Sequence, residues 1–399
     1  MGEPGDRRVL IVAGEASGDH HAARLVEALH GLGPCRVRGV AGPALEAAGV
    51  ERVVAMEDLA VLGFSGVVAR LPRLWSAYHR LLSDARSFRP HAAVLVDSPG
   101  FNFRLGPALK RLGIPIFYYI APQVWAWHAE RAARMAGWVD RLAVIFPFEE
   151  PLFQGAGVNA RFVGHPLLEG LEPEVDEATF RGELGLAAGT RILGLLPGSR
   201  RQELLAHLRP MLAAARELAS GRPDVAVVVG LAPGLASGRG RPARAADDVS
   251  GGGGVARRGD REGDRGPGTP HVVRGRTHAL QACATCCAVA SGTATLETAL
   301  FATPEVIVYR TGWLNFAIAR RVVKLPRIGL PNIVAGAEVA PELIQGDLTA
   351  ARLAAALAPW LDDPAARERQ RVKLAAVRAA LGVPGAAGRA AAWLWEMLA

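Results

Sequence analysis

The 399-residue sequence has no apolar run that reaches the ~18 residues of a membrane-spanning helix. Its first apolar run, residues 9–13, is also too short to be the core of a secretory signal peptide. We therefore expect a cytoplasmic protein. Half of the residues are hydrophobic and 21% are charged, which is typical of a globular protein, and the length allows two domains with a core each.

Cysteine is scarce: the chain has four, of which Cys283, Cys286 and Cys287 lie close together. This set does not form a disulfide framework. A zinc site would need a second C-x-x-C pair or histidines at a standard spacing, and neither is present. We interpret the three as packed side chains of a helix and a buried strand. No D-x-D triplet occurs, so neither a metal nor another cofactor is expected.

The chain carries a formal net charge of +8, which favours acidic partners such as nucleotide phosphates, anionic lipid or nucleic acid. Residues 237–276 alone contain nine arginines against five acidic residues, so the basic excess elsewhere is modest. Aromatic residues are not interleaved with the basic ones as they are on a nucleic-acid stacking surface. A nucleic-acid partner is therefore not expected.

Short apolar runs alternate with amphipathic segments along most of the chain. Runs rich in Val and Ile predict buried strands at 9–13, 92–96, 114–120, 142–146, 192–196, 225–229 and 306–309. Helical patterns lie between them, for example at 20–30, 204–219 and 294–301. The alternation pauses in the acidic stretch 169–177 and restarts at Arg191. It predicts two doubly wound α/β domains, each with a parallel sheet between helices, and a cleft between the domains.

Residues 237–276 break this pattern, because they have almost no large apolar side chains and cannot bury enough surface to offset their ordering entropy. A structureless loop of this length is unusual inside a compact domain. One explanation is a disordered surface insertion. The other explanation is a sequence translated from GC-rich DNA in a shifted reading frame, with the original frame restored before Thr277. Neither explanation makes the segment part of an active site.

The sequence GEASGD at 14–19 ends the first predicted strand and leads directly into a helix. Such a turn puts backbone N–H groups and a helix N-terminus at the mouth of a cleft. A tight turn capped by Asp19 or Ser17 explains Gly18 and Asp19 equally well, so Glu15 and Ser17 are the better functional candidates. The turn is not G-x-G-x-x-G, and this disfavours a nicotinamide-dependent oxidoreductase.

Asp97 follows the predicted strand 92–96, where an open α/β sheet presents catalytic groups. A helix cap is the alternative role for this carboxylate. Pro99 biases Ser98 away from the helical conformation and so is expected to delay the helix start by several residues. This favours an Asp97 side chain that faces the cleft.

Two further strand ends carry residues suited to a phosphate. The sequence LPGSR at 196–200 places Arg200 beside a Gly-Ser turn, where guanidinium and backbone N–H groups can share an anion. The sequence ASGTATLE at 290–297 puts small hydroxyl residues and a helix N-terminus after a strand, so that a pyrophosphate can approach closely. Glu297 can accept hydrogen bonds from ribose hydroxyls, or it is a first-turn glutamate stabilised by the helix dipole.

Apolar residues recur at helical spacing between residues 64 and 78. They are Phe64, Val67, Val68, Leu71, Leu74, Trp75 and Tyr78. A helix that faces the core is one explanation. The nearby Arg70, Arg73 and Arg80 favour another, in which arginines meet anionic lipid while Trp75 and Phe64 enter the acyl boundary. A second basic and apolar stretch at 313–325 supports membrane contact.

Eight short motifs follow one another in order along the chain. They are VAGEASGD (12–19), Asp97 with Pro99 and Phe101-Asn102, APQVWAW (121–127), FPFE (146–149), GHP (164–166), LPGSR (196–200), ASGTATLE (290–297) and LPN (330–332). In this order the sequence resembles the lipid-A-disaccharide synthase family over residues 9–236 and 277–345. No single motif decides the resemblance, but eight in sequence are highly specific.

The resemblance implies a GT-B fold, with two Rossmann-like domains and a C-terminal helix that crosses back to the first. We expect an acceptor- and membrane-facing domain at 1–168, a UDP-sugar domain at 190–365 and returning helices at 366–399. The implied protein is a peripheral enzyme at the inner face of the cytoplasmic membrane, and a homodimer is compatible with it. Such an enzyme joins UDP-2,3-diacylglucosamine to 2,3-diacylglucosamine 1-phosphate in lipopolysaccharide synthesis.

Matched position by position, the resemblance makes Asp97 the general base. It implies substrate contacts by Glu15, Ser17, Gly18, Asn102, Arg200, Ser291, Gly292, Thr293, Glu297, Tyr309, Arg310 and Asn315. Gly100 stands where an acidic residue is expected, which leaves Asp97 without a second carboxylate.

The implied reaction is a single inverting displacement with UDP as the leaving group. A UDP-sugar epimerase, another lipid-linked glycosyltransferase on the same fold and a non-catalytic membrane-surface protein are the alternatives.

Overall fold

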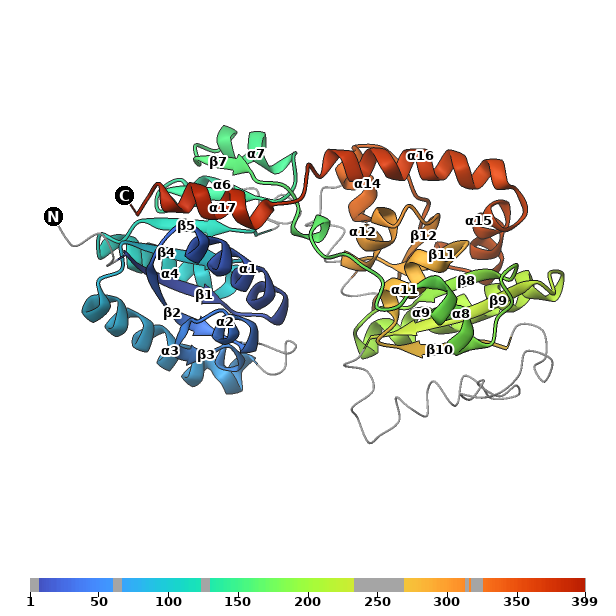
Figure 1. Ribbon diagram of the computed structural model, residues 1–399, viewed down its shortest axis with the longest axis horizontal. Helices are drawn as coiled ribbons and strands as arrows, with labels where there is room; N and C mark the ends of the chain where they lie inside the picture. Colours follow the sequence, from blue (N-terminus) through green and yellow to red (C-terminus); the bar gives the residue numbers. More distant parts are fainter. Residues whose placement is uncertain are drawn as a thin grey trace. The chain divides into compact units, whose positions relative to one another are not determined.

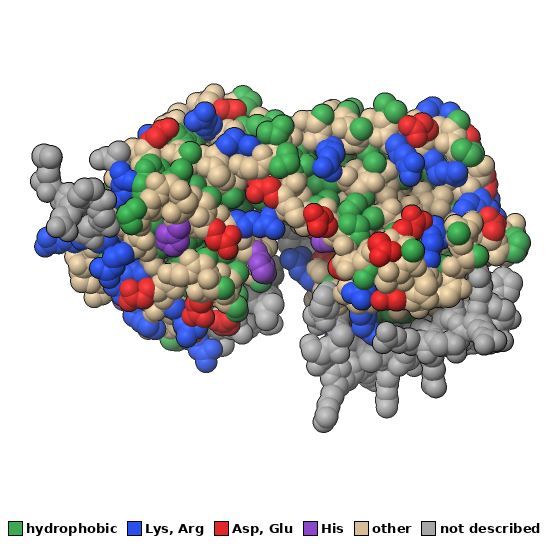
Figure 2. Space-filling view, in the orientation of Figure 1, with side chains coloured by type: hydrophobic (Ala, Val, Ile, Leu, Met, Phe, Trp, Pro, Cys, Tyr) green, Lys and Arg blue, Asp and Glu red, His purple; other side chains and the backbone are tan. Residues whose placement is uncertain are grey.

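The computed structural model describes residues 7–59, 67–122, 130–232, 269–312, 316 and 326–398, without the side chains of 67–70. The chain forms two compact units (Figure 1). The first unit comprises Met1–Glu169 together with Leu381–Ala399, and the second comprises Gly170–Ala380. On the face shown in Figure 2, basic and acidic side chains are mixed over the surface of both units.

A parallel sheet of seven strands forms the centre of the first unit. Its strand order is β3 (Glu51–Ala55), β2 (Cys35–Ala41), β1 (Arg7–Ala13), β4 (Ala92–Val96), β5 (Ile116–Tyr119), β6 (Arg141–Val144) and β7 (Ala160–Phe162). Successive side chains of a strand point to opposite faces. Accordingly Leu10 and Val12 belong to one buried cluster, whereas Val9 and Ile11 belong to another. Both faces of the sheet are therefore buried, as parallel sheets require.

Helices cover the two faces of this sheet (Figure 1). One face packs against α1 (Ala16–Leu32), α2 (Pro43–Ala47) and α17 (Ala386–Trp395). The other packs against α3 (Val67–Phe88), α4 (Pro99–Arg111), α6 (Glu130–Met135) and α7 (Glu149–Gly155). Short 3-10 helices occupy Met56–Asp58 and Pro166–Leu168. This sandwich holds the carboxyl ends of β1 and β4 side by side, where the first set of candidate residues lies.

The second unit repeats this plan with six parallel strands. Their order is β10 (His271–Arg274), β9 (Val225–Leu231), β8 (Arg191–Leu196), β11 (Cys286–Ala290), β12 (Glu305–Tyr309) and β13 (Glu342–Ile344). The helices of one face are α8 (Glu177–Leu184) and α11 (Thr277–Cys283), and those of the other are α9 (Arg201–Ser220) and α15 (Ala350–Asp362). Further helices are α12 (Thr293–Leu300), α14 (Leu330–Ala335) and α16 (Pro364–Ala380), with a 3-10 turn at Gln345–Asp347.

The predicted pair of doubly wound parallel-sheet domains is confirmed. All seven predicted strands are present, with ends that shift by at most a few residues. The cysteine interpretation also holds: Cys283 lies at the end of α11, and Cys286 and Cys287 are buried in β11. The strands that periodicity missed are short or interrupted by arginine, as in the sequence CRVRGVA of β2.

The return of the chain to the first unit begins later than residue 366. Helix α16 belongs to the second unit, where Leu374 and Val377 are buried and the Arg378 guanidinium donates to the Leu300 carbonyl at 3.1 Å. Only α17 returns, and it packs against α1 (Figure 1). The amphipathic pattern of α16 could not show which sheet its apolar side covers.

The last residues of the segment 237–276 belong to the regular α/β fold, although the composition of the whole segment is unusual. Residues 271–274 form β10, the edge strand of the second sheet, which pairs in parallel with β9. Val273 is buried in the core beneath that edge. The expectation that nothing in this segment contributes to a core is therefore wrong for its last residues. The residues 237–268 lie outside the described part of the chain.

Candidate active site

The strand order of the first unit reverses between β1 and β4, which run side by side. Ligands of open α/β sheets bind outside the carboxyl ends of strands at such a switch point. The loop after β1 carries Gly14 and Glu15, and the loop after β4 carries Asp97 and Ser98. A Cβ atom on Gly14 would lie 2.6 Å from the Ser98 hydroxyl oxygen. Glycine at position 14 therefore lets the two loops approach each other.

Asp97 and Ser98 both have a positive φ of 43°. This is the left-handed region, which costs free energy for residues other than glycine and persists only where the surroundings impose it. The surroundings here are two side chains that donate hydrogen bonds to the Asp97 carbonyl oxygen. One is the Tyr118 hydroxyl and the other is the Asn102 amide, at 2.7 Å. The Asp97 main chain is thus fixed without use of its carboxylate.

Helix α4 begins at Pro99, immediately after this turn, and not several residues later as expected. Proline is well suited to the first helical position, where no intrahelical N–H bond is lost. A residue before proline avoids the right-handed helical conformation. Ser98 does so by adopting the left-handed conformation, and no longer loop is needed. Ser98 is the N-cap and makes no side-chain capping bond.

The environment of Asp97 raises the pKa of its carboxyl group to about 6. Burial is the largest cause, because a desolvated carboxylate is disfavoured. The negative charge of Glu15 adds to the increase, and the Ser98 backbone N–H opposes it. A carboxylate whose pKa lies near 6 is ionised at neutral pH, yet it is a stronger base than an ordinary aspartate.

Of the other residues predicted in this loop pair, Glu15 and Ser17 are exposed at the start of α1. Gly18 is buried in the first turn of α1. Asn102 is completely buried, and its amide also donates to the Val96 carbonyl at 3.3 Å. It is therefore a positioning residue for the Asp97 turn and not a substrate contact, because a fully buried side chain cannot reach a ligand.

Asp19 does not cap α1, which was one expectation. Its carboxylate accepts hydrogen bonds from the Gly42 and Ala44 amides, at 2.8 and 2.9 Å. These bonds tie α1 to the start of α2. The N-cap of α1 is Glu15, which makes no side-chain capping bond, and its carboxylate remains exposed beside Asp97.

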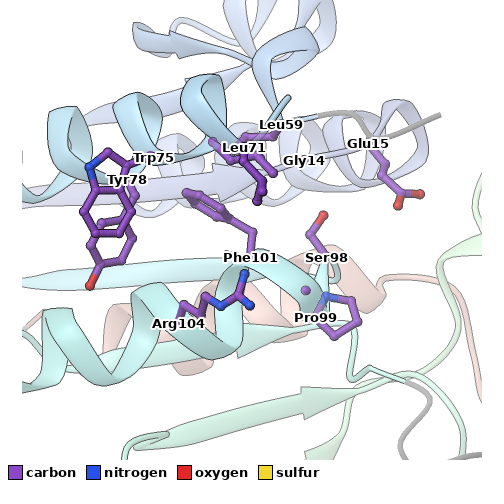
Figure 3. Close-up of a pocket in the computed structure, with 12 residues that line it drawn as sticks. Gly14, Glu15, Leu59, Leu71, Trp75, Tyr78, Ser98, Pro99, Phe101 and Arg104 are labelled. Atoms are coloured by element: carbon purple, nitrogen blue, oxygen red, sulfur yellow. The ribbon is translucent and has the colours of Figure 1, made fainter. Parts of the chain in front are cut away.

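An apolar cavity of about 710 Å³ opens next to the Asp97 turn (Figure 3). Its lining comes from α3, α4, the two loops and the end of the 3-10 helix Met56–Asp58. It comprises Gly14, Glu15, Leu59, Leu71, Leu74, Trp75, Tyr78, Ser98, Pro99, Gly100, Phe101 and Arg104. Three residues predicted to touch a membrane, Leu71, Leu74 and Trp75, are among them. Trp75 is 67% exposed and Leu71 is 49% exposed, whereas Leu74 and Tyr78 also pack against the core.

The side chains of the other three residues predicted to touch a membrane lie outside the described part of the chain. Phe64 lies outside the described residues, and Val67 and Val68 begin α3 with undescribed side chains.

The second unit has its own switch point between β8 and β11. A cavity of about 500 Å³ lies at the carboxyl ends of these strands. Five residues predicted for nucleotide binding line it, namely Arg200, Ser291, Gly292, Thr293 and Glu297. Their convergence from two loops and one helix in a single cavity is the arrangement that the sequence motifs predict.

The loop after β8 has a fixed shape. The Glu203 carboxylate accepts hydrogen bonds from the Ser199 and Arg200 amides, at 3.0 and 3.2 Å. Gly198 has a φ of 113°, and a Cβ there would lie 2.4 Å from the same carboxylate, so only glycine fits. The Arg200 side chain is 82% exposed. Its surface contact with Glu203 is weak, which leaves the guanidinium available to an anion.

The loop after β11 leads into α12 through Ser291 and Gly292. The Ser291 hydroxyl donates to the Ile328 carbonyl at 3.2 Å, and the Thr295 hydroxyl donates to the Gly292 carbonyl at 2.7 Å. The first amides of a helix lack intrahelical partners, and together with the helix dipole they favour an anion. Thr293, the first residue of α12, is exposed in the cavity.

Glu297 lies one turn further along α12, with its carboxylate 3.8 Å from the His278 ring. Burial raises the pKa of the Glu297 carboxyl group, and His278 opposes this increase. Its side chain still reaches the cavity, where it can accept hydrogen bonds from hydroxyl groups.

Several cavity residues were not predicted from the sequence, among them Glu174, Gly275, Thr277 and His278. Glu174 comes from the acidic stretch that we interpreted as a pause between domains. Its carboxylate accepts hydrogen bonds from the His278 and Ala279 amides, at 3.1 and 2.8 Å. Gly275 belongs to the segment 237–276, which therefore does contribute to this cavity, contrary to expectation.

Arg310 does not face the cavity as the sequence suggested. Its guanidinium donates to the Gln345 and Leu348 carbonyl groups, and this use anchors the end of β12 to the following 3-10 turn. Its amide donates to Nε2 of the buried His207, whose Nδ1 contacts the Pro197 carbonyl at 2.9 Å. Tyr309 lies at the end of β12 and outside the cavity lining, and Asn315 lies outside the described residues.

Two units of this topology, each a parallel sheet with helices on both faces, define the GT-B fold class. The fold resembles a putative UDP-N-acetylglucosamine 2-epimerase from Listeria monocytogenes, with a TM-score of 0.64 at 14% identity over 96% of this chain and 94% of that chain. It also resembles Acinetobacter baumannii MurG, with a TM-score of 0.55 at 15% identity over 98% of this chain and 100% of that chain. At such identities these similarities establish the fold alone.

Sequence comparison is more specific. The profile of the family described as Lipid-A-disaccharide synthetase matches residues 9–237 and 269–387. The lipid-A-disaccharide synthase of Anaeromyxobacter sp. (strain K) is 43% identical over 96% of both chains. That of Geobacter metallireducens is 38% identical over 100% of this chain and 99% of its own. The chain therefore belongs to the lipid-A-disaccharide synthase family and is a glycosyltransferase of lipid A biosynthesis.

The family profile leaves residues 238–268 unmatched. We predict that a short Gly/Ser linker in place of 238–268 changes the thermal melting temperature little, because loop-closure entropy varies only slowly with loop length. A matched variant that also removes 269–276 loses β10 and should melt at a clearly lower temperature. Equal destabilisation by both replacements would show that 238–268 supports the fold. Sequencing of the coding DNA then distinguishes an insertion from a shifted frame.

Proposed function

We propose that the chain transfers the diacylglucosamine unit of UDP-2,3-diacylglucosamine to 2,3-diacylglucosamine 1-phosphate and releases UDP. The observation that carries this proposal is Asp97, a carboxylate whose pKa is raised to about 6, at the switch point of the first unit beside an apolar cavity. A base of this kind suits a hydroxyl acceptor, and the apolar cavity suits an acceptor with acyl chains. Membership of the lipid-A-disaccharide synthase family supports both substrates.

The donor is assigned to the cavity of the second unit. The diphosphate is placed at Arg200 and at the start of α12, where a guanidinium and free backbone amides offer positive charge and N–H donors. Glu297 is placed at the ribose hydroxyl groups. Ser291, Gly292 and Thr293 are small enough for a phosphate to approach the backbone.

The proposed chemical step is a single displacement at the anomeric carbon. The Asp97 carboxylate removes the proton from the primary hydroxyl of the acceptor as that oxygen forms a bond to the anomeric carbon. The bond from this carbon to the UDP oxygen breaks, and the configuration inverts. The charge that develops on UDP is stabilised by Arg200 and the α12 amides. The proton on Asp97 then passes to solvent.

A UDP-sugar epimerase on the same fold is the alternative, and several solved structures of similar fold have that name. Their identity to this chain is 11–14%, which carries no functional argument. An epimerase also has no need of an apolar cavity next to its base. The alternative is therefore not favoured.

The acid limb of the pH profile tests the proposed base. Asp97 is active only when it is ionised, so kcat/KM should fall as the pH decreases through about 6. Glu15→Gln removes a negative charge that raises this pKa, and it should therefore move the limb to lower pH. The measurement is kcat/KM against pH for both proteins. A limb that stays in place in Glu15→Gln, or a wild-type limb near the ordinary aspartate value, would contradict this assignment.

Attachment to the inner face of the cytoplasmic membrane is part of the proposal. Among the described residues, no helix has the length and apolar character to cross a membrane. Leu71 and Trp75 on α3 are exposed apolar side chains at the mouth of the apolar cavity. Side chains in this position can enter the acyl boundary while an acyl chain passes into the cavity. A homodimer is compatible with this arrangement.

We predict that the double variant Leu71→Ser, Trp75→Ser binds vesicles of anionic phospholipid less tightly and keeps its affinity for UDP. Vesicle affinity should fall because the variant buries less apolar surface in the bilayer. Co-sedimentation with vesicles measures it. Leu32→Ser is the matched control, because Leu32 is 45% exposed at the end of α1 and away from the cavity. An equal loss in the control, or none in the double variant, would exclude α3 as the contact.

A further inference from the structure

A second cavity of the first unit, of about 490 Å³, is lined by arginine. Three arginines contribute to it, Arg104 on α4 and Arg131 and Arg134 on α6. The other lining residues are Pro99, Gly100, Phe103, Pro107 and Trp138. We call it the arginine cavity.

The three arginines have no acidic partner in the part of the chain that the structure describes. No carboxylate there lies within 4.0 Å of any of them, although the same unit pairs Arg38, Arg52 and Arg141 with acidic side chains. Three like charges in one cavity repel one another, and a bound anion removes this cost. Guanidinium groups are also the side chains that bind phosphate best, because they donate several hydrogen bonds from a rigid plane.

The floor of the cavity holds this arrangement in place. Trp138 is buried and packs so closely on Gly106 that a Cβ there would lie 2.2 Å from the indole ring. The Phe103 ring meets the Trp138 ring edge-on at 5.6 Å, and the Arg131 guanidinium lies over Phe103 at 5.8 Å. Arg131 is partly buried. Its guanidinium is thus oriented before any ligand binds.

The arginine cavity adjoins the apolar cavity beside Asp97. Pro99, Gly100 and Arg104 line both. One molecule with an apolar part and an anionic group can therefore occupy the two cavities together, next to the proposed base. The acceptor of the proposed reaction has these parts, since it carries two acyl chains, a hydroxyl group and a phosphate monoester.

We infer that Arg104, Arg131 and Arg134 form the site for the phosphate monoester of the acceptor and so determine acceptor specificity. This inference rests on the proposed function. A phosphate monoester is a terminal dianion, and its three free oxygens can accept hydrogen bonds from more than one guanidinium. The proposed function assigns the nucleotide of the donor to the other cavity, which residues of the second unit line, so the arginine cavity is left for the acceptor.

The test compares the acceptor with the same diacylglucosamine that lacks the phosphate. For the wild-type chain, kcat/KM should be higher with the phosphorylated acceptor. Arg131→Gln and Arg134→Gln should each lower kcat/KM for it by about 10- to 100-fold, mostly through KM. Neither variant should change kcat/KM for the acceptor without phosphate. Arg86→Gln on exposed α3 surface removes the same charge and should behave as wild type.

Equal losses with both acceptors, or no loss with either, would overturn the assignment. If vesicle binding falls in the two variants while acceptor preference is unchanged, the arginines serve membrane lipid head groups instead. Acceptor binding in detergent micelles without donor gives a readout independent of turnover. If the wild-type chain makes no disaccharide, the proposed function fails. The phosphate site still stands in that case if micelle binding depends on both the phosphate and the arginines, and it falls if binding depends on neither.

Discussion

Asp97→Asn should lower kcat by about 10²- to 10⁴-fold, which is the usual cost of losing a general base. Asparagine has nearly the shape of aspartate, and the Tyr118 and Asn102 side chains that hold this turn donate to the main-chain carbonyl. The turn should therefore persist. UDP affinity should not change, because the cavity proposed for the nucleotide is lined by residues of the second unit and not by Asp97. The measurements are steady-state turnover and equilibrium UDP binding.

The stability of the same variant separates a catalytic from a structural role. Folding raises the pKa of Asp97 above its unfolded value, so the folded state binds the proton more tightly. The associated stabilisation is complete below the unfolded pKa and is lost as the pH rises through about 6. At neutral pH the buried, ionised carboxylate lowers the free energy of unfolding. Asp97→Asn should therefore melt at the same or a higher temperature. Glu27→Gln, which removes an exposed carboxylate of α1, should keep full activity. More than about a tenth of wild-type turnover in Asp97→Asn would exclude the base role.

Arg200→Gln should weaken UDP binding by about 10- to 100-fold, since a hydrogen bond to a charged group is worth about 1.5–3 kcal/mol. Turnover at saturating donor should fall as well, because the negative charge of the leaving diphosphate grows in the transition state. Little stability should be lost, because Arg200 is 82% exposed and its only salt bridge among the described residues is the surface contact with Glu203.

Arg201→Gln is the matched control for this prediction. Arg201 is the next residue and is also exposed, but it does not line the cavity. It should bind UDP as the wild type does. If both variants lost the same affinity, the effect would come from net charge and not from a contact at position 200. If neither did, the diphosphate would lie elsewhere.

The sequence predicted well those features in which a short motif directly follows a recognisable strand. A Val-rich strand that ends in Asp97 could be placed because parallel strands present their carboxyl ends at one edge of the sheet. The same logic located Arg200 and Ser291 on neighbouring loops of the second sheet. In each case the motif and its strand lie within a few residues of each other.

The features that sequence missed depend on contacts between distant residues. Arg310 looked like a ligand for the donor, yet its guanidinium is used by carbonyl groups 35 and 38 residues further on. Glu174 looked like part of a linker, although it caps the helix that begins at Thr277. Strand β10 was hidden because its four residues end a Gly- and Arg-rich segment. A pattern of neighbouring residues in the sequence cannot show such contacts between distant residues.

Transfer between the two lipid substrates tests the central claim most directly. The purified chain is incubated with UDP-2,3-diacylglucosamine and 2,3-diacylglucosamine 1-phosphate in mixed micelles, and products are followed by mass spectrometry and UDP release. We predict one UDP per disaccharide formed, a new linkage with inverted anomeric configuration, and no UDP release when the acceptor is omitted. UDP release without disaccharide, or an epimerised donor with no transfer, would contradict the account.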